Sequence, residues 1–551
     1  MKTKNWWKSG DPWIWLTAAA VTISIVIVAA LLIFIAVRGL GHFWPAPIMD
    51  AQYTQADGST IRLIGEINDE EIVPAARLKN SGFTVEGDWV TRYLIKTGNR
   101  DLLGLDFRWI LASQLENQKY PENVIVVERR EWGNFYGYLK SVKENGKVIS
   151  EGETAWAELH KRLERALGIQ EKISSIQKSE MGEINYKLER LRLYERRLEL
   201  DNELTANKQV EIAENKAELN ARFEALNKKL EELYTTINRD SFTAEIMDGR
   251  IVDIPLAKVV HVHRPNAMSL FDKVGFYLMK GWEFVSEDPR EANTEGGIFP
   301  AIFGTVIMVL LMSIIVTPIG VIAAIYLHEY AKQGIFTTTI RIAVNNLAGV
   351  PSIVYGVFGL GFFVYFIGGN IDQIFFPEAL PAPTFGSPGL LWASLILALL
   401  TVPVVIVSTE EGLSRIPSSI REGSLALGAT KAETLWRTVL PMASPAMMTG
   451  LILAIARAAG EVAPLMLVGV VKLAPSLPVD LQYPFLHLER QFMHLGFHIY
   501  DVGFQSPNVE AARPLVYATA FLLVAVIVVL NLAAIWIRNR LREKYKALET
   551  A

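Results

Sequence analysis

The sequence predicts an all-α polytopic membrane protein with six transmembrane helices and a soluble α+β insertion between the first and second helices. The first observation is six runs of about 20 residues with almost no charge, each long enough to cross a hydrocarbon layer about 30 Å thick. The second is a polar stretch of about 255 residues between the first two runs. The third is the distribution of Lys and Arg around the runs. The runs cover residues 14–37, 298–327, 347–369, 390–408, 446–469 and 515–537.

The composition excludes several classes of protein. The 551 residues are 51% hydrophobic and 20% charged in this uneven arrangement, which excludes both a single soluble domain and intrinsic disorder. The net charge of −4 gives no reason to expect a nucleic-acid partner. The chain has no Cys, so disulfides and thiol chemistry are excluded. The first run is too long for a cleaved signal peptide and lacks a small-residue cleavage site, so we expect a membrane helix there.

The positive charges predict the orientation. Fourteen Lys and Arg residues flank the runs on the side of the N-terminus, and three flank them on the other side. Because Lys and Arg are enriched in cytoplasmic loops, we expect both termini in the cytoplasm. The insertion then faces the periplasm, and the expected location is the inner membrane of a bacterial cell.

The insertion is expected to combine strands with long helices. Residues 50–150 and 240–265 contain alternating and β-branched runs separated by Gly, Asn and Asp, which is typical of strands, with Asp248 and Gly249 as a hairpin turn. Residues 155–237 lack Pro and repeat Leu mostly at spacings of three, four and seven, which is typical of a coiled coil. A weak stretch at residues 205–209 is a candidate turn. We therefore expect one β domain with an antiparallel helical hairpin inserted into it.

His261 and His263 form a His-x-His pair whose side chains would share one face of a strand. Such a pair could bind a metal, but two His without a nearby third ligand are weak evidence for a site. We predict no metal site and interpret the pair as the end of a surface or domain-junction strand.

The loop at residues 409–441 predicts two short helices on the cytoplasmic side. Ser419 with Glu422 and Thr430 with Glu433 fit capping boxes. A Gly residue at 428 is placed to end the first helix, and a Pro at 441 is placed to stop the second. The loop also carries the apolar residues Leu425, Leu427, Leu435, Trp436, Val439 and Leu440. This pattern suits either insertion into a groove of a partner protein or a helix lying on the lipid surface.

The same loop resembles the EAA loop of binding-protein-dependent ABC importer permeases. Glu422, Gly423 and Ser424 stand where that motif usually has Glu-Ala-Ala. Gly428 follows, and Pro441 closes the loop. Residues 318–330, 348–359 and 456–464 are similar to the phosphate-importer permeases, most closely to the PstA-type subunit. The resemblance covers about residues 298–542, implies the six-helix ABC importer permease fold, and does not include the insertion.

The resemblance implies that the loop contains a coupling helix that docks on a separate ATPase. The residues implied in coupling are Glu422, Gly423, Ser424, Ala426, Leu427, Gly428, Ala429 and Pro441. The implied partners are an ATPase subunit dimer that binds ATP and Mg, a second permease subunit of the PstC type and a periplasmic phosphate-binding protein, with phosphate as the substrate. The implied organisation is a cytoplasmic N-terminus (1–13), transmembrane helix 1 (14–38), a periplasmic insertion (39–296), a permease domain with five transmembrane helices (297–542) and a cytoplasmic tail (543–551).

Two charged residues lie within the fifth run. Arg457 is its twelfth residue, so we expect it near mid-depth, and Glu461 follows at i+4 on the same helical face. A charge at this depth is costly unless it is paired or faces water, so the two residues form either a packing bridge or part of an anion pathway. A guanidinium matches a tetrahedral oxyanion through forked hydrogen bonds. With phosphate as the implied substrate, we predict that Arg457 and Glu461 line its path.

The chain lacks the usual signatures of an enzyme. It has no Gly-x-x-x-x-Gly-Lys-Ser/Thr, no nucleophile elbow and no His-Glu-x-x-His. We therefore expect a transport subunit with no catalytic residues and no cofactor of its own. Two alternatives remain open: a permease for another oxyanion, such as phosphonate, sulfate or molybdate, and a membrane sensor or scaffold that does not transport.

Overall fold

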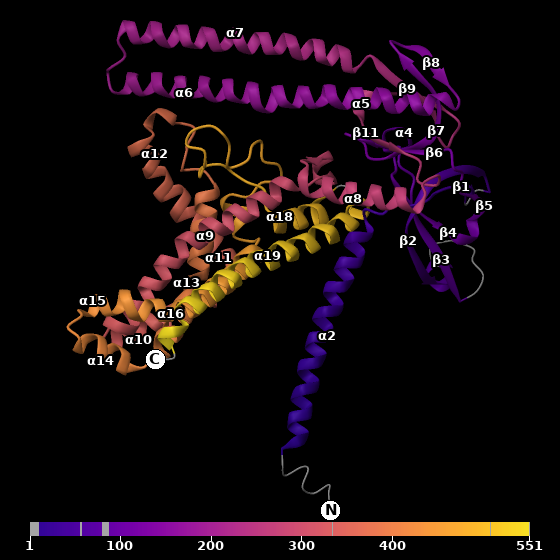
Figure 1. The fold of residues 1–551 in the computed structure, drawn as a ribbon. Helices are drawn as coiled ribbons and strands as arrows, with labels where there is room; N and C mark the ends of the chain where they lie inside the picture. Colours follow the sequence, from indigo (N-terminus) through magenta and orange to yellow (C-terminus); the bar gives the residue numbers. More distant parts are fainter. Residues whose placement is uncertain (1–9, 56–57, 80–87, 333, 507–508, 550–551) are drawn as a thin grey trace, which may run out of the picture. The chain divides into compact units, whose positions relative to one another are not determined.

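The computed structural model describes the chain except residues 1–9, 56–57, 80–87, 333, 507–508 and 550–551 (Figure 1). It divides into two compact units. The membrane unit comprises Met1–His42, Ile298–Phe375 and Pro383–Ala551. The insertion unit comprises Phe43–Gly297 together with the short segment Phe376–Ala382. Each unit has buried apolar clusters of its own.

The six predicted runs are confirmed as helices. Among the described residues, six helices are long and apolar enough to cross a membrane. They are α2 (Asp11–Gly41); α9 (Phe299–Ile325) with the π-helical turn η5 (Tyr326–Tyr330); α11 (Ser352–Phe358) with η6 (Gly359–Gly368) and α12 (Gly369–Phe375); α13 (Leu390–Ser414); α15 (Lys431–Thr434) with η8 (Leu435–Val439) and α16 (Leu440–Gly460); and α19 (Val509–Glu549).

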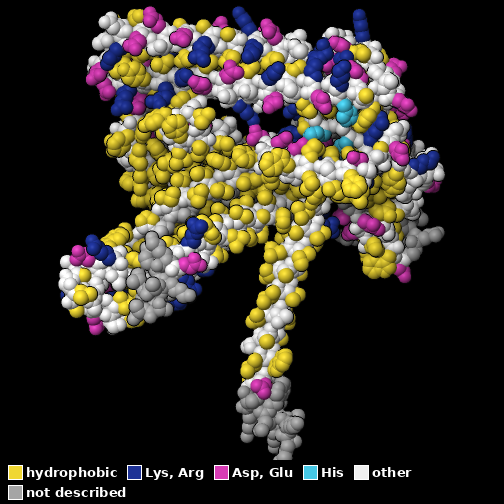
Figure 2. All heavy atoms as spheres, in the orientation of Figure 1, with side chains coloured by type: hydrophobic (Ala, Val, Ile, Leu, Met, Phe, Trp, Pro, Cys, Tyr) yellow, Lys and Arg dark blue, Asp and Glu magenta, His cyan; other side chains and the backbone are white. Residues whose placement is uncertain are grey.

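Helix α13 lies at the centre of the membrane unit. It packs against both α9 and α16, and Ile396 and Leu397 on it are fully buried. Helix α2 differs, because its apolar side chains are exposed along most of its length (Figure 2). It contacts α19 at Gly39, where a Cβ would lie 2.8 Å from the main-chain oxygen of Tyr517, so this close approach requires glycine. Apolar exposure of this extent suits a lipid environment.

The fifth span has different bounds from those predicted. Its helix runs from Lys431 to Gly460, so the expectation that Pro441 stops a helix is wrong. Pro441 is the second residue of α16, which begins directly after the π-helical turn η8, and a widened turn accommodates the hydrogen bond that proline cannot donate. The helix ends at Gly460, because glycine is a poor helix former.

Besides a two-stranded sheet of β12 (Pro289–Arg290) and β13 (Glu295–Gly296), the described part of the insertion unit contains two larger antiparallel sheets. One has the strand order β4-β3-β2-β1-β5, and the other has β10-β9-β7-β6-β11 with β8 also paired to β7. The strands are β1 (Ile48–Thr54), β2 (Thr60–Pro74), β3 (Trp89–Lys96), β4 (Phe107–Leu111), β5 (Leu115–Lys119), β6 (Val124–Arg129), β7 (Phe135–Glu144), β8 (Lys147–Glu151), β9 (Asp240–Glu245), β10 (Ile251–Pro255) and β11 (Val259–His263). Ile48 and Ile64 of the first sheet share a buried cluster with Val124 and Tyr136 of the second.

The predicted hairpin turn at Asp248 and Gly249 is confirmed. Strands β9 and β10 pair antiparallel, and Gly249 has a φ of +81°. The side chain of Asp248 accepts a hydrogen bond of 3.0 Å from the main-chain N–H of Arg250, which closes the turn.

A helical hairpin is inserted between β8 and β9. Helix α5 (Thr154–Ser175) continues through η2 (Ile176–Glu180) into α6 (Met181–Leu200), and α7 (Ala206–Ile237) returns beside them (Figure 1). The hydroxyl of Thr205 caps α7 by accepting from the main-chain N–H of Lys208. At the base of the hairpin, Leu159, Leu163 and Ile237 join the apolar core of the second sheet.

Short elements complete the chain. They are α3 (Ala75–Lys79), α4 (Arg100–Leu103), α8 (Leu270–Ser286), β12 (Pro289–Arg290), β13 (Glu295–Gly296), α10 (Ile335–Leu347), α14 (Ser418–Ala426), α17 (Leu465–Val468) and α18 (Leu495–Tyr500), with 3-10 turns η1 (Ala112–Gln114), η3 (Leu256–Lys258), η4 (Glu291–Asn293) and η7 (Pro377–Ala379) and the π-helical turn η9 (Asp501–Gln505).

Candidate functional site

Residues 418–434, which we call the elbow, form a short helix, a glycine turn and the start of a second helix. Helix α14 ends at Ala426, and Gly428 follows with a φ of +88°, a conformation that favours glycine. The hydroxyl of Thr430 accepts from the main-chain N–H of Glu433 (3.3 Å), and the Glu433 carboxylate accepts from the main-chain N–H of Thr430 (2.9 Å). The predicted helix end at Gly428 and the capping box of Thr430 and Glu433 are confirmed.

The other predicted capping box, Ser419 with Glu422, is wrong. Helix α14 begins at Ser418, directly after Pro417, and no side-chain cap is present at its start. Ser419 therefore lies inside the first helical turn rather than before it. Proline begins this helix instead, because its φ is already close to the helical value.

The elbow directs apolar side chains outward. Leu427 is 91% exposed and Leu425 is 47% exposed. Just beyond the elbow, Trp436 is 72% exposed, whereas Leu435 and Val439 are buried, so only part of the apolar set of this loop lies at its surface. The outward side chains form an apolar surface without a partner of its own within the described chain, as a docking surface requires.

Most of the predicted coupling residues lie together on the elbow. Glu422, Gly423, Ala426, Leu427 and Gly428 are exposed there, and Ser424 and Ala429 are half-buried. The hydroxyl of Ser424 makes a hydrogen bond of 2.9 Å with that of Thr434, which holds the two helices of the elbow together. Pro441 lies outside the elbow, in α16.

An ion pair that the sequence pattern did not indicate fixes the elbow to the end of α9. Arg421 of α14 donates to the Oε1 of Glu329 from Nε at 3.1 Å, and to the main-chain oxygens of Leu413 and Ile416 at 2.7 Å each. The Arg421 and Glu329 side chains are only 20% and 10% exposed. The Nζ of Lys431 also donates to the main-chain oxygen of Glu329. Because Glu329 lies in η5, which continues α9, the ion pair connects the elbow to that helix.

Arg457 and Glu461 form a pair, but not in the predicted geometry. Arg457 lies in the last turn of α16, and Glu461 follows the end of the helix with extended backbone (φ −80°, ψ 133°). The expectation of a shared helical face at mid-span is therefore wrong, since the helix begins earlier and ends at Gly460. The Nε of Arg457 lies 3.8 Å from the Oε1 of Glu461, and the side chains are 33% and 21% exposed. In the described part of the chain, Glu461 is the one charged partner of Arg457.

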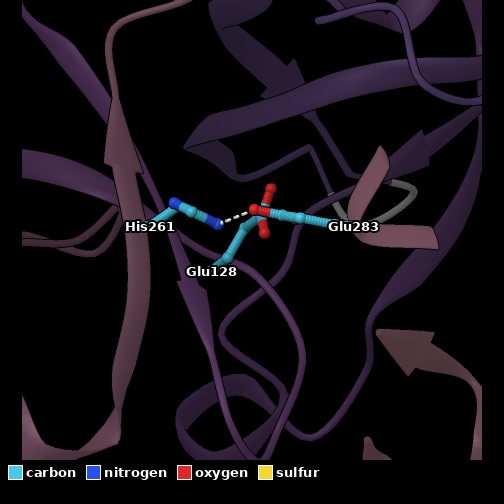
Figure 3. A group of neighbouring side chains, drawn as sticks. All are labelled: Glu128, His261 and Glu283. Atoms are coloured by element: carbon cyan, nitrogen blue, oxygen red, sulfur yellow. Dashed lines mark hydrogen bonds and ion pairs between the residues drawn. The ribbon is translucent and has the colours of Figure 1, made fainter. Parts of the chain in front are cut away.

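The predicted strand position of the His-x-His pair is confirmed, and the structure adds neighbours that the sequence did not indicate. Glu128 of β6, His261 of β11 and Glu283 of α8 place ligand atoms within 4.8 Å of one another (Figure 3). The Nζ of Lys280 forms ion pairs with both carboxylates, at 2.7 Å from the Oε2 of Glu283. Although burial opposes it, Lys280 is the main charge that lowers the pKa of Glu128 to about 2. Lys280 supplies the positive charge that the carboxylates require, so the cluster is an ion-pair network that joins β6, β11 and α8.

His263, the second residue of the pair, faces a different environment. Burial lowers the pKa of His263 to about 4, and its ring lies 4.5 Å from that of Phe276. A neutral imidazole packed on an aromatic ring has a structural role in this unit.

The membrane unit contains the domain of a known family. Residues 316–546 match the family described as "Binding-protein-dependent transport system inner membrane component". This region, which includes the elbow and several of the apolar helices, is thus similar to the membrane components of binding-protein-dependent transport systems.

Its relatives specify the type further, and the predicted resemblance to PstA-type permeases is confirmed. The phosphate transport system permease protein PstA of Mycobacterium leprae is 36% identical over 35% of this chain and 60% of the relative. The protein of the same name from Yersinia pestis is 36% identical over 33% and 56%. The probable ABC transporter permease protein YqgH of Bacillus subtilis is 31% identical over 35% and 59%.

These matches have limited extent. The chain spans about 60% of the length of these curated relatives, and the family match does not include the insertion unit. Among solved structures, an inward-facing MetNI methionine ABC transporter is 18% identical, with a TM-score of 0.32, over 44% of this chain and 94% of that chain.

Proposed function

We propose that this chain is the membrane-spanning permease subunit of an ATP-driven importer of inorganic phosphate in a bacterial inner membrane. One observation carries the proposal: a permease domain with relatives named for phosphate transport presents an exposed apolar elbow that is clamped to a transmembrane helix. The chain supplies the path and the mechanical connection, and ATP and Mg bind on separate ATPase subunits.

The elbow is the proposed point of energy coupling. The exposed Leu427 and Leu425 enter a groove of the ATPase subunit, where water is excluded from them. Gly428 allows the sharp turn that brings α14 and α15 side by side. Movement of the ATPase dimer then pushes α14, and the ion pair of Arg421 with Glu329 carries this movement to α9.

Arg457 is the proposed contact for the anion. Its guanidinium is only half-buried and lies 3.8 Å from Glu461, too far for a strong hydrogen bond, so an oxyanion can compete for its N–H donors. After the anion leaves, the Glu461 carboxylate can pair with the guanidinium of Arg457. This competition lowers the affinity for the anion, so the substrate is released. Buried Ala454, Ala458 and Ala459 let neighbouring helices approach this part of α16 closely.

The proposed assembly contains more than this chain. A second permease subunit of the PstC type completes the path, an ATPase dimer drives it, and a periplasmic phosphate-binding protein delivers the anion. Both termini of this chain lie in the cytoplasm, and the insertion unit lies in the periplasm. There the hairpin of α5, α6 and α7, packed as a coiled coil, serves as a docking arm.

Two experiments test the proposal. The tagged chain is purified in mild detergent, and every protein that accompanies it is identified; an ATPase and a second polytopic permease must appear. The purified assembly is then placed in vesicles, and ATP-driven uptake of radioactive phosphate is measured with phosphonate, sulfate or molybdate as competitors. Uptake that an excess of another oxyanion abolishes identifies a different substrate, and an intact assembly without ATP-driven uptake of any oxyanion refutes the transport role.

A further inference from the structure

Helix α8 has the reverse of the usual distribution of side chains. Its outer face, which we call the α8 stripe, consists of Phe271, Val274, Gly275, Leu278 and Trp282 and carries no charge. Three side chains of the stripe are largely exposed: Phe271 at 88%, Leu278 at 64% and Trp282 at 71%. A helix on a water-soluble domain turns its apolar face inward, so this stripe is not built to face water.

Two charged residues in the C-terminal half of α8 point toward the strands of the insertion unit instead. Lys280 and Glu283 have side chains only 13% and 12% exposed. They form the ion-pair network with Glu128 and His261 that fixes the helix to strands β6 and β11 (Figure 3). Phe284 is 5% exposed on the same inner face. The network therefore fixes the rotation of α8 about its own axis. As a result, the α8 stripe faces away from strands β6 and β11.

The chain connections place α8 close to the membrane. Span α2 ends at Gly41, and two residues later Phe43 packs against Tyr277 and Phe284 of α8, with ring centroids 6.3 Å and 5.1 Å apart. Trp44 lies 6.1 Å from Tyr277. At its other end, α8 stops at Ser286, and the next apolar span begins thirteen residues later at Phe299. Tyr and Trp are the side chains most typical of the boundary between lipid and water.

We propose that α8 lies in the plane of the membrane surface, with the α8 stripe in contact with lipid acyl chains, and thereby attaches the insertion unit to the bilayer. Lipid is the occupant that fits best, because the stripe is uncharged, because the residues that follow span α2 pack on the helix, and because the chain continues from its C-terminal end to span α9. The attachment depends on the membrane spans alone and stands whether or not the chain transports phosphate.

The absence of Cys makes a direct test possible. Leu278→Cys and Ile251→Cys each introduce one site for a nitroxide spin label in the full-length protein, held in nanodiscs of phosphatidylethanolamine and phosphatidylglycerol. Leu278 and Ile251 are equally exposed at 64%, but Ile251 lies on strand β10 away from α8, so it is a matched control. Collisions of each label with oxygen, which concentrates in lipid, and with a water-soluble nickel chelate are measured by electron paramagnetic resonance.

The proposal predicts that the ratio of oxygen to nickel collisions is at least threefold higher at position 278 than at position 251. Labels at Phe271→Cys and Trp282→Cys should follow position 278, and a label at the polar helix end, Ser286→Cys, should give a lower ratio. A label at 278 that collides with nickel as often as the label at 251 places the stripe in water and overturns the proposal. A label protected from both reagents places the stripe against protein and also overturns it.

Discussion

The elbow makes a quantitative prediction for the variant Leu427→Ala. The side chain of Leu427 is 91% exposed in this chain, so its truncation removes no internal packing. If the side chain is buried in a groove of the ATPase subunit, the variant loses three buried carbons, at about 0.8 kcal/mol each, or roughly 2 kcal/mol of binding free energy. Since about 1.4 kcal/mol corresponds to a tenfold change, the affinity of the ATPase subunit should fall roughly thirtyfold.

The assay is equilibrium binding of the purified ATPase subunit to the permease in nanodiscs. Leu481→Ala is the matched control, because Leu481 is 95% exposed and lies on the loop between α17 and α18, which the proposed topology places on the opposite side of the membrane. We expect unchanged affinity for that variant and unchanged thermal stability for both. An affinity of Leu427→Ala within twofold of the parent protein would refute the docking role of the elbow.

Three further predictions follow from the charged groups. Arg421→Met and Glu329→Gln, combined in a double-mutant cycle of unfolding free energies, should give a coupling energy of about 2 kcal/mol because the pair is largely buried; a value below about 0.5 kcal/mol contradicts the clamp. Arg457→Ala should lower ATP-driven phosphate uptake at least tenfold at equal expression, and Arg457→Lys should recover only part of it because lysine lacks the fork; unchanged uptake in the alanine variant removes Arg457 from the path. Burial raises the pKa of Glu295 to about 7, above its ordinary value of 4.5, so the folded state loses stability as the pH rises from about 4.5 to 7 and stays less stable above it. Glu295→Gln should therefore raise the melting temperature at pH 8 and have little effect at pH 5, and an equal effect at both pH values contradicts this.

The sequence predicted the membrane helices well because their signal is local. Each span is a run of neighbouring apolar residues, and its length alone decides whether it can cross a bilayer. The bounds of the fifth span were missed because Pro441 was given too much weight. Whether a proline ends a helix depends on the conformation of the preceding backbone. Here a π-helical turn accommodates Pro441, and no sequence pattern predicts that turn.

The elbow was predictable in part for the same reason. The turn at Gly428 and the capping box of Thr430 depend on residues within three positions of each other. The ion pair of Arg421 with Glu329 joins residues 92 positions apart, and Glu128 reaches Lys280 across 152 positions. No periodicity relates such residues, so only the three-dimensional fold shows that they meet.

The central claim is that the elbow faces the cytoplasm, and labelling from each side of the membrane tests it most directly. In an otherwise Cys-free chain, Leu427→Cys and Leu481→Cys are treated with a membrane-impermeant maleimide, in sealed spheroplasts and in inside-out vesicles. The account predicts that position 427 reacts only in inside-out vesicles and position 481 only in spheroplasts. Reaction of position 427 in intact spheroplasts would contradict the account, because no cytoplasmic ATPase could then reach the elbow.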